Sequence, residues 1–331
     1  MKSYAFGVDI GGTTIKIGLF TTGGDLLDSW EIPTRRQSDG AYILPDIAEA
    51  VDNKLAEKGL SKLDVEGIGV GVPGPVGPDG IVFKCVNLGW DVFNVEHRLS
   101  SLTGLKAKAG NDANVAALGE IWQGGGKGCQ DIVMVTLGTG IGGGVIIGGR
   151  IFGGINGAAG EIGHIPINDD EDEICGCGKR GCLEQYASAN GIVRITKRYL
   201  AAHPDVGSSL GTMDKYSCKE IFDEAKSGDA AAVNMVEEVG RLLGKALASV
   251  ACVVNPEAFV IGGGMSKAGP MLIEVIRKNF RNYAFHASRE TEFRLAELGN
   301  SAGIYGGVRM VLEGNMSRPL GVEETSSISA I

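Results

Sequence analysis

The chain has 331 residues, 44% of them hydrophobic and 21% charged, and carries a formal net charge of −9 at pH 7. This length exceeds one compact core and suits two α/β lobes. The acidic balance, without a Lys/Arg block, argues against a nucleic-acid-binding protein. No signal peptide or bilayer-length apolar run is visible, so we expect no membrane association.

The first third of the chain is predicted to begin as a three-stranded meander and to continue as alternating helices and strands. Apolar residues recur with period two where the meander is expected, which is typical of strands. Strands are predicted at 4–8, 15–19, 26–32, 65–72 and 106–109, and helices at 42–57, at 92–102 and from 112 onward.

The second part opens with a predicted strand pair joined by a Gly-rich turn, followed by a loop-rich insert and several helices. The strands are expected at 132–137, 142–147 and 258–261, and a last helix at 302–312. We predict a small lobe of residues 1–112 completed by about 301–314, and a large lobe of residues 113–300 with an insert at about 153–184. Residues 315–331 are Ser-rich without periodicity, which predicts a mobile tail.

A Gly-rich turn between the first two strands is a candidate phosphate loop. Its glycines let backbone N–H groups approach an anion, and Asp9 could hold the hydration shell of Mg²⁺. The candidate contacts are Asp9, Gly11, Gly12, Thr13, Thr14 and Lys16. A strand follows the glycines, so this is not a Rossmann loop, and no P-loop motif occurs. A plain Gly-Gly hairpin is the alternative.

Two further Gly-rich loops follow strands in the second part of the chain. One contains Thr139 and Gly140, and the other is Gly262-Gly263-Gly264. One such loop is weak evidence, but three of them, each at a strand end, indicate a nucleotide held between two lobes.

Three cysteines within eight residues predict a metal site. Cys175, Cys177 and Cys182 are separated by glycines, as a tight tetrahedral Zn²⁺ turn requires, and His164 upstream is the natural fourth ligand. Four protein ligands leave no open position, so the Zn²⁺ should be structural. The alternative is three unrelated buried thiols. The other four cysteines are dispersed in a chain too large to need disulfides, which indicates a reducing, cytoplasmic compartment.

Several polar residues do not indicate a function when each is considered alone. Asp112 follows a short strand and precedes a helix, where a helix cap is its favoured interpretation. Glu161 and Glu184 would usually be solvated charges.

The assembled motifs resemble the actin-like ATPase superfamily and, more narrowly, the ROK family of repressors and sugar kinases, over about residues 4–314. The resemblance implies a two-lobed α/β actin-like ATPase (ribonuclease H-like) fold that holds ATP between its lobes, with the active site in the interlobe cleft. The second phosphate loop opens with Thr136, where the wider superfamily usually has Asp, and ROK sugar kinases share this difference.

The resemblance also implies roles at matching positions. Asp112 would be the general base that deprotonates a hexose hydroxyl, the 6-hydroxyl by analogy, during transfer of the γ-phosphoryl group from ATP·Mg²⁺. The implied sugar contacts are Asn87, Asn111, Asp112, Glu161, His164 and Glu184. The zinc turn would order the loop that carries His164 and Glu184, and His164 could bind metal through one ring nitrogen and sugar through the other.

The motifs look most like those of bacterial ROK glucokinases, which are commonly homodimers or homotetramers. ROK kinases for N-acetylmannosamine, mannose, allose or fructose remain alternatives, and replacement of ATP by polyphosphate stays open. A ROK transcriptional repressor is less favoured because Asp9 leaves no room for an N-terminal helix-turn-helix domain. A chaperone or filament ATPase would have no use for the zinc turn.

Overall fold

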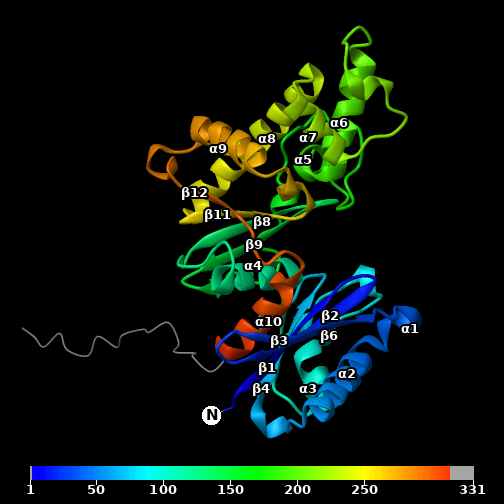
Figure 1. Cartoon of the computed structure of the whole chain (residues 1–331), viewed down its shortest axis with the longest axis vertical. Coiled ribbons are helices and arrows are strands. Elements are labelled where there is room, and N and C mark those ends of the chain that lie inside the picture. Colours follow the sequence, from blue (N-terminus) through cyan, green and yellow to red (C-terminus); the bar gives the residue numbers. More distant parts are fainter. Residues whose placement is uncertain (1, 314–331) are drawn as a thin grey trace, which may run out of the picture.

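The computed structural model describes residues 2–313 and contains a five-stranded sheet in each half of the chain (Figure 1). The first sheet, in spatial order, consists of β3 (Leu26–Pro33), β2 (Thr14–Thr21), β1 (Tyr4–Ile10), β4 (Val65–Val72) and β7 (Ala107–Asn111). The predicted meander and the strand at 65–72 are confirmed. The predicted tail at 315–331 lies outside the described residues.

The two faces of the first sheet pack against different helices. Phe6, Val8 and Ile10 join the hydrophobic core that contains α2 (Ile43–Lys58) and α3 (Val95–Thr103). Because side chains alternate along a strand, Asp9 lies on the opposite face of β1. That face is covered by α10 (Ala302–Glu313). The alternation therefore keeps Asp9 out of the apolar core.

Two helices lie between the sheets, α4 (Asp112–Gln123) and α10 (Figure 1). Helix α4 contacts β4 of the first sheet and β8 and β9 of the second. The α10 backbone lies directly on β4, since a Cβ atom at Gly69 would lie 1.9 Å from the Gly307 carbonyl oxygen. Only glycine permits this approach, which brings the start of α10 beside Asp9.

The second sheet consists of β10 (Arg150–Ile151), β9 (Ile141–Ile147), β8 (Ile132–Leu137), β11 (Ala258–Gly262) and β12 (Glu292–Leu295). Its other helices are α5 (Glu184–Ala187), α6 (Ala189–Ala202), α7 (Cys218–Ser227), α8 (Ala230–Val254) and α9 (Pro270–Tyr283). Val133, Val135 and Phe259 pack on this helical layer, while Met134 and Val260 face α4. The sheet is therefore buried on both faces.

The remaining elements are short. These are the short α1 (Gln37–Gly40), the strand pair β5 (Ile81–Val82) and β6 (Phe93–Asn94), and the 3₁₀ turns η1 (Lys62–Asp64), η2 (Val86–Leu88), η3 (Ile162–His164), η4 (Ser209–Thr212), η5 (Gly264–Ala268), η6 (His286–Ser288) and η7 (Gly299–Ser301). Among residues 2–313, no helix has the length and apolar character that a bilayer span requires.

The structure differs from the predictions in a few details. The helix expected at 92–102 begins at Val95, because the Asn94 side chain caps it by accepting a hydrogen bond from the His97 N–H at 2.7 Å. Strand β12 was not predicted. It is a short edge strand whose residues are only partly buried or exposed, so it lacks a buried apolar pattern.

Candidate active site and metal centre

Asp9 and Asp112 approach each other from two strands of the first sheet, β1 and β7, that lie on either side of β4. Asp9 is paired in register with Gly71 of β4, and Asp112 follows β7, whose last residue pairs with Val72. A Cβ atom at Gly71 would lie 3.5 Å from both the Asp9 Oδ1 and the Asp112 Cα. The glycine leaves no side chain between the two acids, so a ligand could contact both.

The structure corrects the assignment of the helix cap. Asn111, not Asp112, is the N-cap of α4, and its Oδ1 accepts hydrogen bonds from the Ala113 and Asn114 N–H groups at 3.1 and 3.2 Å. Asp112 is the first helical residue, and its Oδ1 accepts from the Ala113 N–H at 2.8 Å and from Asn111 Nδ2 at 3.1 Å. The Asp112 Oδ1 is thus held by the protein through two hydrogen bonds.

Burial changes the acidity of both carboxyl groups. It raises the pKa of Asp9 from 3.8 to about 6, and the negative charge of Asp112 adds to the rise, while Lys16 opposes it. The pKa of Asp112 is also raised, first by burial and then by the charge of Glu161, against the hydrogen bond from Ala113. A carboxylate with a raised pKa is a stronger proton acceptor near neutral pH.

The first predicted phosphate loop is a tight hairpin tip between β1 and β2. The Gly11 N–H donates to the Thr14 carbonyl at 3.0 Å, and the Thr34 hydroxyl donates to the Gly11 carbonyl at 2.7 Å. Gly12, Thr13 and Thr14 are exposed at this tip. Lys16 pairs with Asp9 across β1 and β2, and its Nζ donates to the Ser301 hydroxyl, just before α10, at 2.9 Å.

The second and third loops lie side by side at the ends of parallel strands. Gly262 pairs with Thr136 across β11 and β8. A Cβ atom at Gly263 would lie 2.5 Å from the Leu137 carbonyl oxygen, so the two loops are in close contact. The predicted residues Thr139, Gly140 and Gly264 therefore lie beyond the carboxyl ends of the adjacent strands β8 and β11.

The predicted metal ligands form one cluster. Ligand atoms of His164, Cys175, Cys177 and Cys182 all lie within 4.8 Å of one another. The Cys177 and Cys182 sulfurs are 3.6 Å apart, and the Cys175 Sγ is 3.8 Å from His164 Nδ1. Zn–S bonds of about 2.3 Å in a tetrahedron place sulfurs about 3.8 Å apart, so this donor set fits Zn²⁺.

Glu184 connects the metal cluster to the second phosphate loop. Its Oε1 accepts a hydrogen bond from the Cys175 Sγ at 3.0 Å, and its Oε2 accepts one from the Ile141 N–H at 3.4 Å. His164 Nε2 faces the Glu161 Oε2 at 3.8 Å, while its Nδ1 faces the cluster. These three predicted sugar contacts therefore lie together.

Asn87 is not brought into this group. It lies in η2 of the first lobe, exposed, and no side-chain hydrogen bond joins it to another predicted site residue within residues 2–313.

A buried ion network fixes the metal loop to α6, and sequence reasoning missed it. The Glu171 carboxylate is buried and pairs with Arg194 at 2.5 Å and with Arg198 at 3.2 Å. Burial opposes ionisation, but hydrogen bonds from Arg194 and Tyr186 hold the pKa of Glu171 well below its usual range. Arg194 and Arg198 are four residues apart on one helix face, a spacing that could have indicated an acid-binding helix.

Several cavities surround these elements. One of about 380 Å³ joins the second loop to the metal insert, and its lining includes Thr139, Gly140, Cys175, Glu184 and Arg194. Another of about 230 Å³ lies beside Gly264, between α7 and η5.

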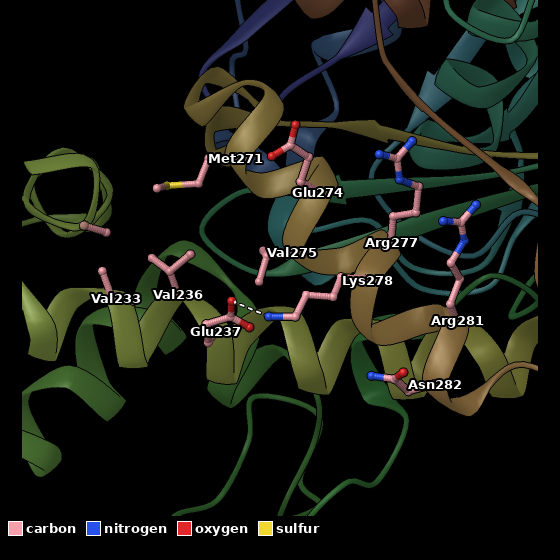
Figure 2. Close-up of a pocket in the computed structure, with 11 residues that line it drawn as sticks. Val233, Val236, Glu237, Met271, Glu274, Val275, Arg277, Lys278, Arg281 and Asn282 are labelled. Atoms are coloured by element: carbon pink, nitrogen blue, oxygen red, sulfur yellow. Dashed lines mark hydrogen bonds and ion pairs between the residues drawn. The ribbon is translucent and has the colours of Figure 1, made fainter. Parts of the chain in front are cut away.

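A larger cavity of about 710 Å³ contains none of the predicted site residues. It lies between α8 and α9, where Val236 and Val275 form an apolar floor and Lys278 pairs with Glu237 at 2.9 Å (Figure 2). None of the residues that line this cavity belongs to the three Gly-rich loops.

Comparison with known proteins gives matches over nearly the whole chain. The model of the ROK family matches residues 5–313. A glucokinase from Halalkalibacterium halodurans is 44% identical over 96% of this chain and 97% of its own.

Solved structures of ROK family proteins are also similar to this chain. A ROK family glucokinase from Streptomyces griseus, in complex with glucose and AMPPNP, superposes with a TM-score of 0.71 at 35% identity, over 92% of this chain and 98% of that one. A ROK family transcriptional regulator, a homologue of the E. coli MLC protein, superposes with a TM-score of 0.81 at 25% identity, over 95% of this chain and 78% of the regulator.

Proposed function

The chain belongs to the ROK family, as its motifs predicted, and on this premise we propose that it is an ATP-dependent glucokinase that phosphorylates the 6-hydroxyl of glucose. The observation that carries this proposal is the 44% identity with a glucokinase over 96% of the chain. The two-lobed actin-like fold is shared with the glucokinase structure that holds glucose and AMPPNP.

Asp112 acts as the general base in this proposal. Its Oδ1 is held by the Ala113 N–H and by Asn111, so the carboxylate has a fixed orientation. The raised pKa favours uptake of the hydroxyl proton as the oxygen attacks the γ-phosphorus. Positioning and charge neutralisation are the main demands of phosphoryl transfer, so one carboxylate suffices as base.

The nucleotide lies across the three Gly-rich loops. The exposed tip at Gly12–Thr14 and the loop at Thr139–Gly140 would donate N–H and hydroxyl groups to the phosphates. The cavity beside Gly264 would take the adenosine. Mg²⁺ held through water by Asp9 would neutralise charge on the phosphate oxygens.

The sugar is bound by residues that the metal cluster holds in place. Glu161, His164 and Glu184 offer acceptors to neighbouring hydroxyls, and such a site rejects analogues that lack them. His164 Nδ1 and the three cysteines would hold a structural Zn²⁺, which leaves His164 Nε2 beside Glu161 for the sugar. Zn²⁺ would order this loop and take no part in the transfer.

A coupled ADP-release assay over glucose, mannose, fructose, allose and the N-acetylated hexosamines tests the proposal. We expect glucose to give the highest kcat/KM. A higher value for another hexose would replace glucose in the proposal, and no sugar-dependent ADP release with any of them would overturn the kinase itself. We expect a cytoplasmic homodimer or homotetramer, which light scattering after size exclusion would distinguish.

A further inference from the structure

We propose that Gly157 is a positioning residue for the kinase reaction, through which the first lobe holds the loop that carries Glu161 when the lobes close. This inference rests on the proposed function. It concerns a backbone contact between the insert at 153–184 and the turn after β4, two segments far apart in the sequence.

The contact leaves no space for a side chain. Gly157 has a φ of +75°, and a Cβ atom there would lie 2.7 Å from the carbonyl oxygen of Val76 and 2.9 Å from its nitrogen. Real Cβ atoms do not approach other atoms this closely. Because the neighbour is main chain, it cannot rotate away as a flexible side chain would.

Val76 belongs to a well-packed part of the first lobe. It is 7% exposed, belongs to the core that includes β1 and β4, and forms a bridge with Val82. The Cys85 thiol donates to the Pro73 carbonyl at 2.8 Å, which ties the same turn to the segment before Asn87. A larger residue at 157 would therefore displace the insert loop, not the turn.

The Val76 turn is also connected to the general base. The Gly74 carbonyl accepts a hydrogen bond from Asn111 Nδ2 at 3.3 Å, and the same nitrogen donates to Asp112 Oδ1. The surface that receives Gly157 thus belongs to the segment that orients Asp112.

On the other side, the loop transmits the contact to Glu161. The Ala159 N–H donates to the Gly153 carbonyl at 3.0 Å, which closes the loop. Gly160 lies on β9, since a Cβ atom there would be 2.7 Å from the Gly143 carbonyl oxygen. Glu161 follows directly, so a shift at Gly157 would reach an acid that lies 3.8 Å from His164 Nε2 and whose charge raises the pKa of Asp112.

A matched pair of variants separates this contact from backbone strain. Gly154 lies in the same loop with a φ of +71°, but the nearest atom to an added Cβ is the Ala159 Cβ at 3.4 Å. Gly157→Ala and Gly154→Ala therefore share the penalty of a left-handed backbone, and only Gly157→Ala collides with Val76.

The experiment measures KM, kcat and sugar-independent ATP hydrolysis for both variants, with whichever sugar the wild-type enzyme phosphorylates best. We expect Gly157→Ala to raise KM for the sugar about tenfold or more and to increase ATP hydrolysis relative to transfer, with KM for ATP nearly unchanged. Gly154→Ala should differ from the wild type by about twofold at most.

Each outcome is decisive. Equal kinetic effects in the two variants, or an equal loss of sugar and ATP affinity in Gly157→Ala, would overturn the inference while the wild-type activity stands. A wild-type protein with no sugar-dependent ADP release would remove the proposed function, and the inference with it. Thermal unfolding of both variants confirms that each is folded, and similar unfolding temperatures are expected.

Discussion

Asp9 and Asp112 lie on either side of Gly71, and each is mostly removed from water. The charge of Asp112 contributes to the raised pKa of Asp9, so the two carboxylates oppose each other's ionisation. Such a pair is unfavourable in the empty protein and becomes favourable when a cation and a hydroxyl arrive. The arrangement is typical of an active site, because the repulsion between the two carboxylates destabilises the folded protein.

Asp112→Asn should lower kcat by about two to four orders of magnitude, because it removes a general base and keeps the shape of the site. Sugar affinity should be largely kept, since the amide preserves most hydrogen bonds. Steady-state kinetics together with calorimetric sugar binding measure the two effects. Asp91→Asn, on an exposed residue of the first lobe, is the control. Near wild-type turnover in Asp112→Asn would remove the residue from this role.

Asp9→Asn should stabilise the metal-free protein at about pH 8 while abolishing activity. The folded state binds the Asp9 proton more tightly than the unfolded state, so stability falls as pH rises from 3.8 to about 6 and stays lower above that window. Removing the charge should recover roughly 2–3 kcal/mol. Urea denaturation at about pH 4 and pH 8 tests this, since the gain should be nearly absent at the lower pH. A loss of stability at the higher pH would contradict it.

The acidic limb of the pH–rate profile should lie above the ordinary range of an aspartate. Activity requires ionised Asp112, whose pKa is raised by burial and by the charge of Glu161, so kcat should fall as the pH drops through this raised value. Glu161→Gln removes one cause and should move the limb to lower pH when the sugar is saturating. Its kcat profile against pH checks this, and an unmoved limb would show that Glu161 has no electrostatic effect on the base.

Much of the fold was predictable because its signals are local. The strand at 65–72 is a continuous buried run, and the cysteines at 175, 177 and 182 are separated by glycines, so spacing alone indicated a strand and a metal turn. The Asn111-Asp112 pair shows the limit of such signals. Both residues can cap a helix, and only the backbone reveals that Asn111 does so and frees Asp112.

Other features depend on contacts that no local pattern contains. Glu171 is buried because Arg194 and Arg198 reach it from a helix more than twenty residues away. The approach of Gly157 to Val76 joins segments of two lobes. In each case the residue types are ordinary for a loop or a surface helix, so their roles appear only once the chain is folded.

Cys177→Ser should reduce sugar binding more than nucleotide binding. The cluster would hold His164 directly, and it would order the segment from Cys175 to Cys182 that leads into Glu184, so loss of the metal should release two sugar contacts. We expect sugar affinity to fall about 10- to 100-fold and nucleotide affinity to change about twofold at most. Elemental analysis should give zinc in the wild type and less in the variant. Cys252→Ser, on an exposed cysteine outside the cluster, is the control. Unchanged sugar affinity in zinc-free protein would contradict the prediction.

Glu120 holds the helix between the lobes to the segment before α10, and its removal should destabilise the whole chain. Its fully buried carboxylate accepts hydrogen bonds from the N–H groups of Gly125, Glu297 and Leu298 at 2.8, 3.0 and 2.9 Å. Glu120→Ala leaves all three donors without an acceptor, and one buried unpaired group costs about 1–3 kcal/mol, so the loss should be about 3 kcal/mol or more. Glu120→Gln keeps one acceptor oxygen and should lose less. Urea denaturation measures both, with exposed Glu31→Ala as the control. Equal stability of Glu120→Ala and wild type would show that water replaces the carboxylate, and the segment before α10 would then be held by the packing of α10 on α4 alone.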